Sequence, residues 1–201
     1  MWVLGLTGSI GMGKSTAASM LRRMGVFTHE SDHAVHQALA PGGSAFEEVA
    51  VTFPDAWNKK THTINRQILG KIIFENPGAR QELEKILHPV VRQAQEKFIR
   101  HHHRLGQKHV CLDIPLLFET GAENRVDAVI VVTAPFDIQR RRVLARPGMT
   151  EDKFLAILNA QMPDAEKQAR ADFVVSSGLG YAHLYHSLHQ VIQMIKGMAY
   201  A

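Results

Sequence analysis

The chain has 201 residues, of which 45% are hydrophobic and 21% charged, a balance typical of a soluble globular protein with a sizeable core. No segment approaches the roughly eighteen apolar residues of a membrane-spanning helix. The formal net charge of +4 comes without the interleaved aromatic and basic residues that stack on single-stranded nucleic acid. We therefore expect phosphorylated small molecules as ligands, with no nucleic-acid or membrane partner. The expected assembly is a monomer or a small homo-oligomer.

The N-terminus leads from Met1 directly into an apolar segment, with neither a basic leader nor a cleavage signal, so no export is expected. Cys111 is the single cysteine, which excludes an intrachain disulfide and suits a reducing, cytoplasmic location. Because Cys111 lies within an apolar run, we expect a buried strand residue rather than a nucleophile.

The first predicted elements are a strand at residues 2–7, a glycine loop at 8–15 and a helix that continues to about residue 24. The loop reads Gly-Ser-Ile-Gly-Met-Gly-Lys-Ser, which is the phosphate-binding pattern G-x-x-x-x-G-K-[ST]. Its glycines let backbone N–H groups point at phosphate oxygens, while Lys14 reaches the β/γ-phosphates and the Ser15 hydroxyl ligates Mg²⁺. A chance match is disfavoured by the flanking strand and helix, whose N-terminus attracts anions. The residues predicted to bind the nucleotide are Gly8, Gly11, Met12, Gly13, Lys14, Ser15 and Thr16.

Asp32 follows a second short strand candidate at residues 26–29. The carboxyl ends of strands in a doubly wound sheet gather at the ligand crevice. Asp32 could therefore accept a proton from an acceptor hydroxyl as it attacks the γ-phosphate. The alternative is an N-cap for a helix that begins near His33, and the pattern by itself favours neither reading.

Residues 31–107 are mostly helical in pattern and look like an insertion that binds a second substrate. Asn76-Pro77 is a good helix entry, His88-Pro89 is expected to kink or split the helix that follows, and Gly106 ends it. Three adjacent histidines at residues 101–103 cannot all face one metal on a helix, so a solvated helix end is favoured over a metal site.

Continuous apolar runs at residues 109–114, 128–132 and 173–175 predict strands buried on both faces, as in a parallel sheet. The predicted fold class is α/β: a P-loop NTPase fold with a five-stranded parallel sheet, helices on both faces, a helical acceptor-binding insertion and a helical lid. The expected parts are a nucleotide core at 1–30, 109–134 and 171–201, an insertion at 31–108 and a lid at 135–170.

Two further constellations fit this fold. Asp113 ends the third predicted strand, where P-loop NTPases carry an aspartate that holds Mg²⁺ directly or through water; a strand-end cap is the alternative. Arg142 and Arg146 are four residues apart in a basic helix, and two guanidinium groups on one face could clamp the charge of a transferring phosphate. A solvated basic face is the alternative, but the Pro147-Gly148 turn that follows resembles a mobile lid.

Together these motifs resemble the dephospho-coenzyme A kinase family, from Gly5 to about Leu184. The most specific segments are residues 83–92, with a Leu-Glu…His-Pro pattern, and residues 113–119, with Pro-Leu-Leu-Phe-Glu. Residues 64–66 (Ile-Asn-Arg) and 171–175 (Ala-Asp-Phe-Val-Val) are similar to two further family segments.

The resemblance implies a cytosolic kinase that moves the ATP γ-phosphate to the ribose 3′-hydroxyl of dephospho-coenzyme A, with Mg²⁺ as cofactor. It implies that Asp32 is the general base. It also implies that the acceptor site includes Arg66 and His88, with Leu117 and Glu119 nearby. By the same resemblance, Arg142 and Arg146 hold phosphates from the lid side.

The chain departs from the family pattern at three places. Glu30-Ser31 stands where Asp-Ala usually precedes the aspartate, Asn65 replaces an Asp, and Ser176-Ser177-Gly178 stands where an Asn is common, which leaves the adenine contacts there undefined. Two other functions compete. A kinase for another small acceptor, such as a nucleoside monophosphate or shikimate, lacks the two specific segments. A P-loop switch or nucleic-acid-dependent ATPase does not need the lid.

Overall fold

The computed structural model describes residues 1–198, and the chain divides into two compact units. Unit 1 consists of Met1–His29 and Ile99–Ala201, and unit 2 of Glu30–Phe98. The predicted core segment 171–201 ends in residues 199–201, which lie outside the described part of the chain. Within the described residues no helix is both long and apolar enough to cross a membrane.

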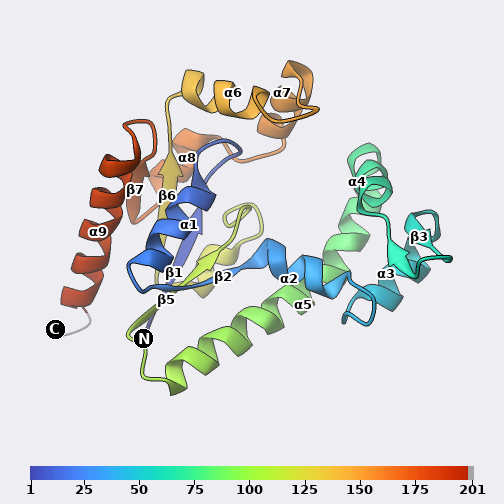
Figure 1. Ribbon diagram of the computed structural model, residues 1–201, viewed down its shortest axis with the longest axis horizontal. Coiled ribbons are helices and arrows are strands. Elements are labelled where there is room, and N and C mark those ends of the chain that lie inside the picture. The colour runs from blue at the N-terminus through green and yellow to red at the C-terminus, as the bar shows by residue number, and fades with distance from the viewer. Residues whose placement is uncertain (199–201) are drawn as a thin grey trace. The chain divides into compact units, whose positions relative to one another are not determined.

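Residues 1–198 contain a five-stranded parallel sheet in the order β2-β5-β1-β6-β7, as predicted for this fold class (Figure 1). The strand at the centre is β1, paired on one side with β5 and on the other with β6. The strands are β1 (Trp2–Thr7), β2 (Phe27–Glu30), β5 (His109–Asp113), β6 (Ala128–Thr133) and β7 (Phe173–Ser176).

Helices cover both faces of this sheet. Alternate residues of a strand point to opposite faces, and on β6 Ile130 and Val132 join the core cluster formed with the helices α1 and α9. Val129 and Val131 are also buried but point the other way, and α8 packs against β6. In Figure 1, α1 lies in front of the sheet and α8 behind it. The helices of unit 1 are α1 (Lys14–Arg23), α6 (Phe136–Leu144), α7 (Glu151–Asn159), α8 (Asp164–Arg170) and α9 (Tyr181–Met198).

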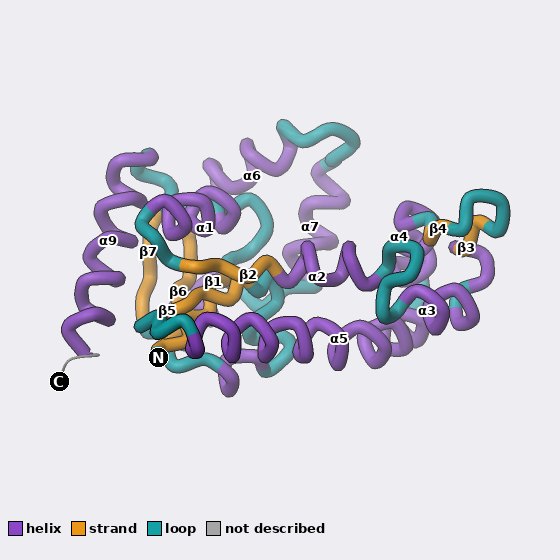
Figure 2. The backbone as a smooth tube through the Cα atoms, turned by 60° about the horizontal axis from the view of Figure 1, so that its bottom comes forward, coloured by secondary structure: helices purple, strands orange, loops and turns teal. Residues whose placement is uncertain are grey.

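Unit 2 has its own hydrophobic core, formed around residues such as Phe46, Val49, Leu69 and Leu83. The sequence prediction of a mostly helical segment missed a short antiparallel pair, β3 with β4, because two-residue strands carry no periodicity (Figure 2). The elements are α2 (Ser31–Ala38), α3 (Phe46–Thr52), β3 (Trp57–Asn58), β4 (Thr63–Ile64), α4 (Arg66–Glu75) and α5 (Pro77–Arg104).

Asparagine side chains start two helices of unit 2. The Asn65 side chain accepts hydrogen bonds from the N–H groups of Gln67 and Ile68 at 3.0 and 3.1 Å, and so caps α4. Asn and Asp are about equally good N-caps, which explains why Asn65 can replace the usual Asp. The helix entry at Asn76-Pro77 is confirmed, since the Asn76 side chain accepts from the N–H groups of the next turn.

The expectation for His88-Pro89 was a helix that is kinked or split, and the split did not occur. His88-Pro89 does not split the helix, because α5 continues through Pro89 to Arg104. A proline in a helix leaves the carbonyl four residues earlier without its donor. Here that carbonyl belongs to Lys85, which is exposed together with His88 and Pro89, so water can satisfy it.

Candidate active site

The phosphate loop joins β1 to α1, and its glycines adopt conformations that other residues avoid. Gly11 and Gly13 have φ angles of 77° and 91°, in the left-handed region that strains any residue with a Cβ. A Cβ on Gly8 would lie 2.6 Å from the carbonyl oxygen of Val132 in β6, so only glycine fits there. The loop therefore has the backbone geometry that its sequence pattern predicts.

Lys14 and Asp113, the two residues expected from P-loop NTPases, lie in contact. Lys14 Nζ donates a hydrogen bond to Asp113 Oδ1, and the pair is largely buried. Asp113 is the last residue of β5, next to Leu6 of β1, and so the parallel pairing of these strands brings it to the start of the loop. Two groups about a hundred positions apart in the sequence thus form one charged site.

The donor set at this site fits a magnesium ion. Ser15 lies exposed in the first turn of α1, and Asp113 supplies a carboxylate at the neighbouring strand end. Mg²⁺ needs only one or two protein oxygens, because substrate phosphates and water complete its coordination. Groups of three or more acidic, histidine or cysteine side chains suited to a metal are absent from the described residues.

Arg142 links the phosphate loop to the turn after β7. Its guanidinium donates to Ser177 Oγ at 2.7 Å and to the Ser177 carbonyl at 2.9 Å, and lies 3.5 Å from the Gly11 carbonyl. Ser177 Oγ in turn donates to the carbonyl of Met12 at 2.6 Å. The turn after β7, where the family commonly has an Asn, is therefore tied to the loop through a serine.

The expectation that Arg142 and Arg146 share one helix face is wrong. Helix α6 ends at Leu144, and Arg146 lies beyond it in the turn before α7, with an exposed side chain. The turn stops the helix because Pro147 and Gly148 follow, and Gly148 has a φ of 73°. Across this turn Arg140 of α6 binds Glu151 of α7 through two hydrogen bonds of 2.8 and 2.5 Å.

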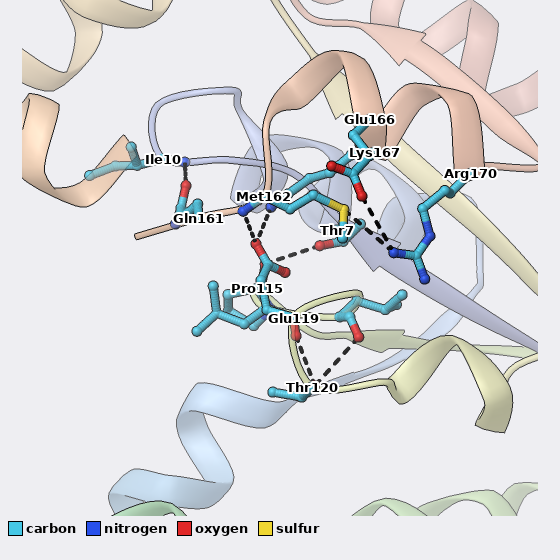
Figure 3. Close-up of polar contacts among 12 residues, drawn as sticks. Thr7, Ile10, Pro115, Glu119, Thr120, Gln161, Met162, Glu166, Lys167 and Arg170 are labelled. Carbon is cyan, nitrogen blue, oxygen red and sulfur yellow. Dashed lines mark hydrogen bonds and ion pairs between the residues drawn. The ribbon is translucent and has the colours of Figure 1, made fainter. Parts of the chain in front are cut away.

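Leu117 and Glu119 follow β5 and are engaged inside unit 1. Leu117 is fully buried, close enough to Gly5 that a Cβ there would lie 2.6 Å from its Cδ1. Glu119 Oε1 accepts from the N–H of Met162 at 2.9 Å and lies 2.8 Å from Lys167 Nζ (Figure 3). Both residues therefore support the loop after β5.

The three predicted site residues of unit 2 are exposed on three helices. Asp32 lies in the first turn of α2, Arg66 is the first residue of α4, and His88 lies within α5. The N-cap alternative for Asp32 is wrong, because α2 begins at Ser31 and Glu30 occupies the cap position. Asp32 is thus an exposed carboxylate in the first turn of a helix.

Ser31, which stands where the family usually has Ala, makes a contact of its own. Its hydroxyl accepts a hydrogen bond of 2.9 Å from the buried amide of Gln95. Ser31 therefore fits at this position of unit 2, because its added hydroxyl meets a polar partner rather than an apolar core.

Two other predictions concern groups outside the site. Cys111 is fully buried in β5, as expected, and burial raises the pKa of its thiol far above the usual range. The histidine run was expected to be solvated, but His102 is only 8% exposed and stacks on Phe27 with ring centroids 4.3 Å apart. Only its neighbours His101 and His103 are exposed.

The sequence did not reveal three further residues, namely Gln139 and Gln161, which contact the loop, and Lys167, which contacts Glu119. Gln139 and Gln161 bind the backbone of Ile10, and Lys167 is completely buried against Glu119. A lysine without any exposure is rare unless it is paired, but no spacing in the sequence marks it in advance.

With this geometry in view, the chain can be compared with known proteins. Residues 2–180 match the family described as Dephospho-CoA kinase. A dephospho-CoA kinase of Brucella melitensis is 47% identical over 197 residues, covering 98% of this chain and 96% of the relative.

Solved structures agree with this match. A crystal structure of a Thermus thermophilus protein superposes with a TM-score of 0.83 and 33% identity, covering 96% of both chains. The dephospho-CoA kinase of Campylobacter jejuni gives a TM-score of 0.71 and 29% identity, covering 97% of this chain and 98% of that one. The family profile and the relatives span nearly the whole chain, and the chain belongs to the dephospho-coenzyme A kinase family.

Proposed function

We propose that unit 1 binds ATP through the phosphate loop and that unit 2 binds the acceptor in one phosphoryl-transfer reaction. The reaction is the transfer of the ATP γ-phosphate to the ribose 3′-hydroxyl of dephospho-coenzyme A, which gives coenzyme A and ADP. The observation that carries the nucleotide half of the proposal is the contact between Lys14 and Asp113 beside a glycine loop of the required geometry.

We propose that the loop N–H groups and Lys14 hold the β- and γ-phosphates. Backbone donors from Gly8 to Thr16 would surround the phosphates, and Lys14 would bind their oxygens. Ser15 and Asp113 would hold Mg²⁺, directly or through water, and the bound ion would neutralise charge that develops on the phosphate oxygens. Arg146, exposed in the turn before α7, and Arg142 would add positive charge from the lid side.

We propose Asp32 as the general base. Its carboxylate takes the proton of the 3′-hydroxyl as that oxygen bonds to the γ-phosphorus, and the bond from phosphorus to the bridging oxygen of ADP breaks. The structure supports this role by removing the competing one, since Asp32 is not the cap of α2. Its exposure also leaves it accessible to a substrate.

We propose Arg66 and His88 as acceptor ligands. Both are exposed and polar, and the family resemblance assigns them to the acceptor side. An arginine is suited to a phosphate group of dephospho-coenzyme A, because its planar fork matches phosphate oxygens. Leu117 and Glu119 would shape the acceptor side indirectly, because Leu117 is buried and Glu119 already accepts a hydrogen bond from Met162.

The proposed setting is the cytoplasm, on the evidence of a single buried cysteine with no possible intrachain partner. The assembly is proposed to be a monomer or a small homo-oligomer.

One experiment tests the function directly. The purified chain is supplied with ATP, Mg²⁺ and a panel of hydroxyl acceptors that includes dephospho-coenzyme A, a nucleoside monophosphate and shikimate, and products are identified by mass. We expect a mass gain of one phosphate on dephospho-coenzyme A alone. Transfer to another acceptor and none to dephospho-coenzyme A would contradict the proposal, and acceptor-independent ATP hydrolysis would indicate a switch or ATPase.

A further inference from the structure

Two glutamines hold one residue of the phosphate loop from opposite sides. The N–H of Ile10 donates a hydrogen bond of 3.1 Å to Gln161 Oε1 (Figure 3), and the carbonyl of Ile10 accepts one of 2.8 Å from Gln139 Nε2. Gln139 lies on α6 and is almost fully buried, and Gln161 lies between α7 and α8. Neither residue belongs to the phosphate-binding pattern.

The side chain of an amide suits this task. It carries both a donor and an acceptor, and a peptide group presents both an N–H and a carbonyl. Ile10 precedes Gly11 and Gly13, whose left-handed conformations turn the loop. Fixing Ile10 therefore fixes the start of the turn, and with it the direction in which the following N–H groups point.

Gln161 is held in turn by a buried ion pair. Its neighbour Met162 donates a backbone hydrogen bond of 2.9 Å to Glu119 Oε1, and Lys167 Nζ lies 2.8 Å from the same oxygen. Lys167 has no exposed surface, while the Glu119 side chain is 17% exposed. A charge buried to this degree is tolerated only with a partner, so Lys167 and Glu119 hold each other in place.

We propose that Gln161 and Gln139 are positioning residues for the phosphate loop, and that the Glu119–Lys167 pair keeps Gln161 in position. Preorganised donors stabilise phosphate charge better than donors that must be reordered on binding. Both glutamines belong to residues 135–170, the predicted lid, so the loop geometry depends on the conformation of that segment. The choice of ATP as the ligand rests on the proposed function.

The first test replaces Gln161 by Met, which keeps the length of the side chain but loses the acceptor. Binding of a fluorescent ATP analogue is measured without acceptor, and KM is measured for each substrate. We expect affinity for the ATP analogue to fall about fivefold, the effect of one neutral hydrogen bond, with little change in the KM for dephospho-coenzyme A or in the melting temperature. An unchanged affinity for the analogue would overturn the proposal.

Gln193→Met is the matched control, because Gln193 is an exposed glutamine of α9 whose side chain contacts His189. It should leave the affinity for the analogue unchanged. An equal loss in Gln193→Met and Gln161→Met would also overturn the proposal, since the effect would then not depend on contact with Ile10.

The ion pair is tested with the double variant Lys167→Met/Glu119→Gln, because Lys167→Met alone strands a buried carboxylate and could prevent folding. We expect the double variant to weaken binding of the ATP analogue by about the same factor as Gln161→Met. Adding Gln161→Met to the double variant should then change the affinity for the ATP analogue little. If the losses of affinity from Gln161→Met and from the double variant multiply, the ion pair does not act through Gln161, and that part of the proposal is overturned.

Failure of this inference is distinguishable from failure of the proposed function. If dephospho-coenzyme A is not the acceptor, the wild-type chain already fails the acceptor panel, yet binding of the ATP analogue still reports on Gln161. If only the inference is wrong, the wild-type chain phosphorylates dephospho-coenzyme A and the variants bind the analogue normally.

Discussion

At the scale of single residues, the structure changes how Lys14 is understood. Its ammonium group binds Asp113, so the lysine is held next to the loop. A preformed charge of this kind costs little reorganisation when phosphate binds. Asp113 gains a second role as well, because it positions the lysine in addition to its proposed part in holding Mg²⁺.

Lys14→Ala is expected to lower turnover by about 10²–10³-fold, the range observed when one transition-state donor is removed. Steady-state kinetics with dephospho-coenzyme A measure this, and circular dichroism confirms folding. Since the change also removes one partner of the buried Asp113, a modest fall in melting temperature is expected too. Near wild-type turnover would mean that the loop is not the phosphate site.

Asp32→Asn tests the proposed base. Asparagine keeps the shape of the side chain but cannot take a proton, so turnover should fall by roughly 10²–10⁴-fold. Affinity for ATP should barely change, because the phosphate loop is proposed to hold the nucleotide independently of Asp32. Stability should also change little, since the side chain is exposed and is not the cap of α2. Activity within a few-fold of wild type would remove Asp32 from the mechanism, as a loose transition state needs little proton removal.

Cys111 is expected to be inert in the folded protein. It is fully buried, and burial raises the pKa of its thiol far above neutral pH, so the reactive thiolate is scarce. A colourimetric thiol reagent should therefore show no reaction in buffer and one thiol per chain in denaturant. Rapid labelling of the native protein would contradict the burial of β5.

At the scale of elements, the lid prediction depends on α6, α7 and the turn between them. The bidentate contact between Arg140 and Glu151 joins the two helices across the turn that contains Arg146. These side chains are exposed, so the contact adds little stability by itself, but it orients the two helices relative to each other. A segment linked in this way can move as one piece.

We expect amide hydrogen exchange across residues 140–165 to slow when an ATP analogue and dephospho-coenzyme A are both present. Closure over the ligands would exclude water that could otherwise hydrolyse ATP. The analogue alone should protect the phosphate loop and have a smaller effect on this segment. An exchange pattern that is the same with and without ligands would show that residues 140–165 are not a moving lid.

At the scale of the whole molecule, each unit has its own hydrophobic core. Units with separate cores can respond separately to ligands. If the proposed division of labour is correct, an ATP analogue alone should slow exchange around residues 8–16, and dephospho-coenzyme A alone should slow it around Arg66 and His88. Dephospho-coenzyme A that protects only residues of unit 1 would contradict an acceptor site in unit 2.

Much of this molecule could be predicted because its signals are local in the sequence. Apolar runs predicted β1, β5, β6 and β7, a short strand candidate at residues 26–29 predicted β2, and the phosphate-binding pattern predicted the loop between β1 and α1. The entry of α5 at Asn76-Pro77 was predicted for the same reason, since capping involves only neighbouring residues. The Leu-Glu…His-Pro and Pro-Leu-Leu-Phe-Glu segments then pointed to the family.

What the sequence by itself determined is therefore the fold class, the phosphate loop and the family. Only the tertiary structure decided that Lys14 meets Asp113, that Arg142 braces the turn after β7, and that two glutamines hold Ile10. It also decided that α6 ends before Arg146 and that Asp32 is not a cap. The ends of α2 and α6 lie within two residues of the predicted ones, a margin that local capping signals do not resolve. The physical reason for the side-chain contacts is that they join residues far apart along the chain. Their formation depends on the order and register of the strands, which no local pattern encodes.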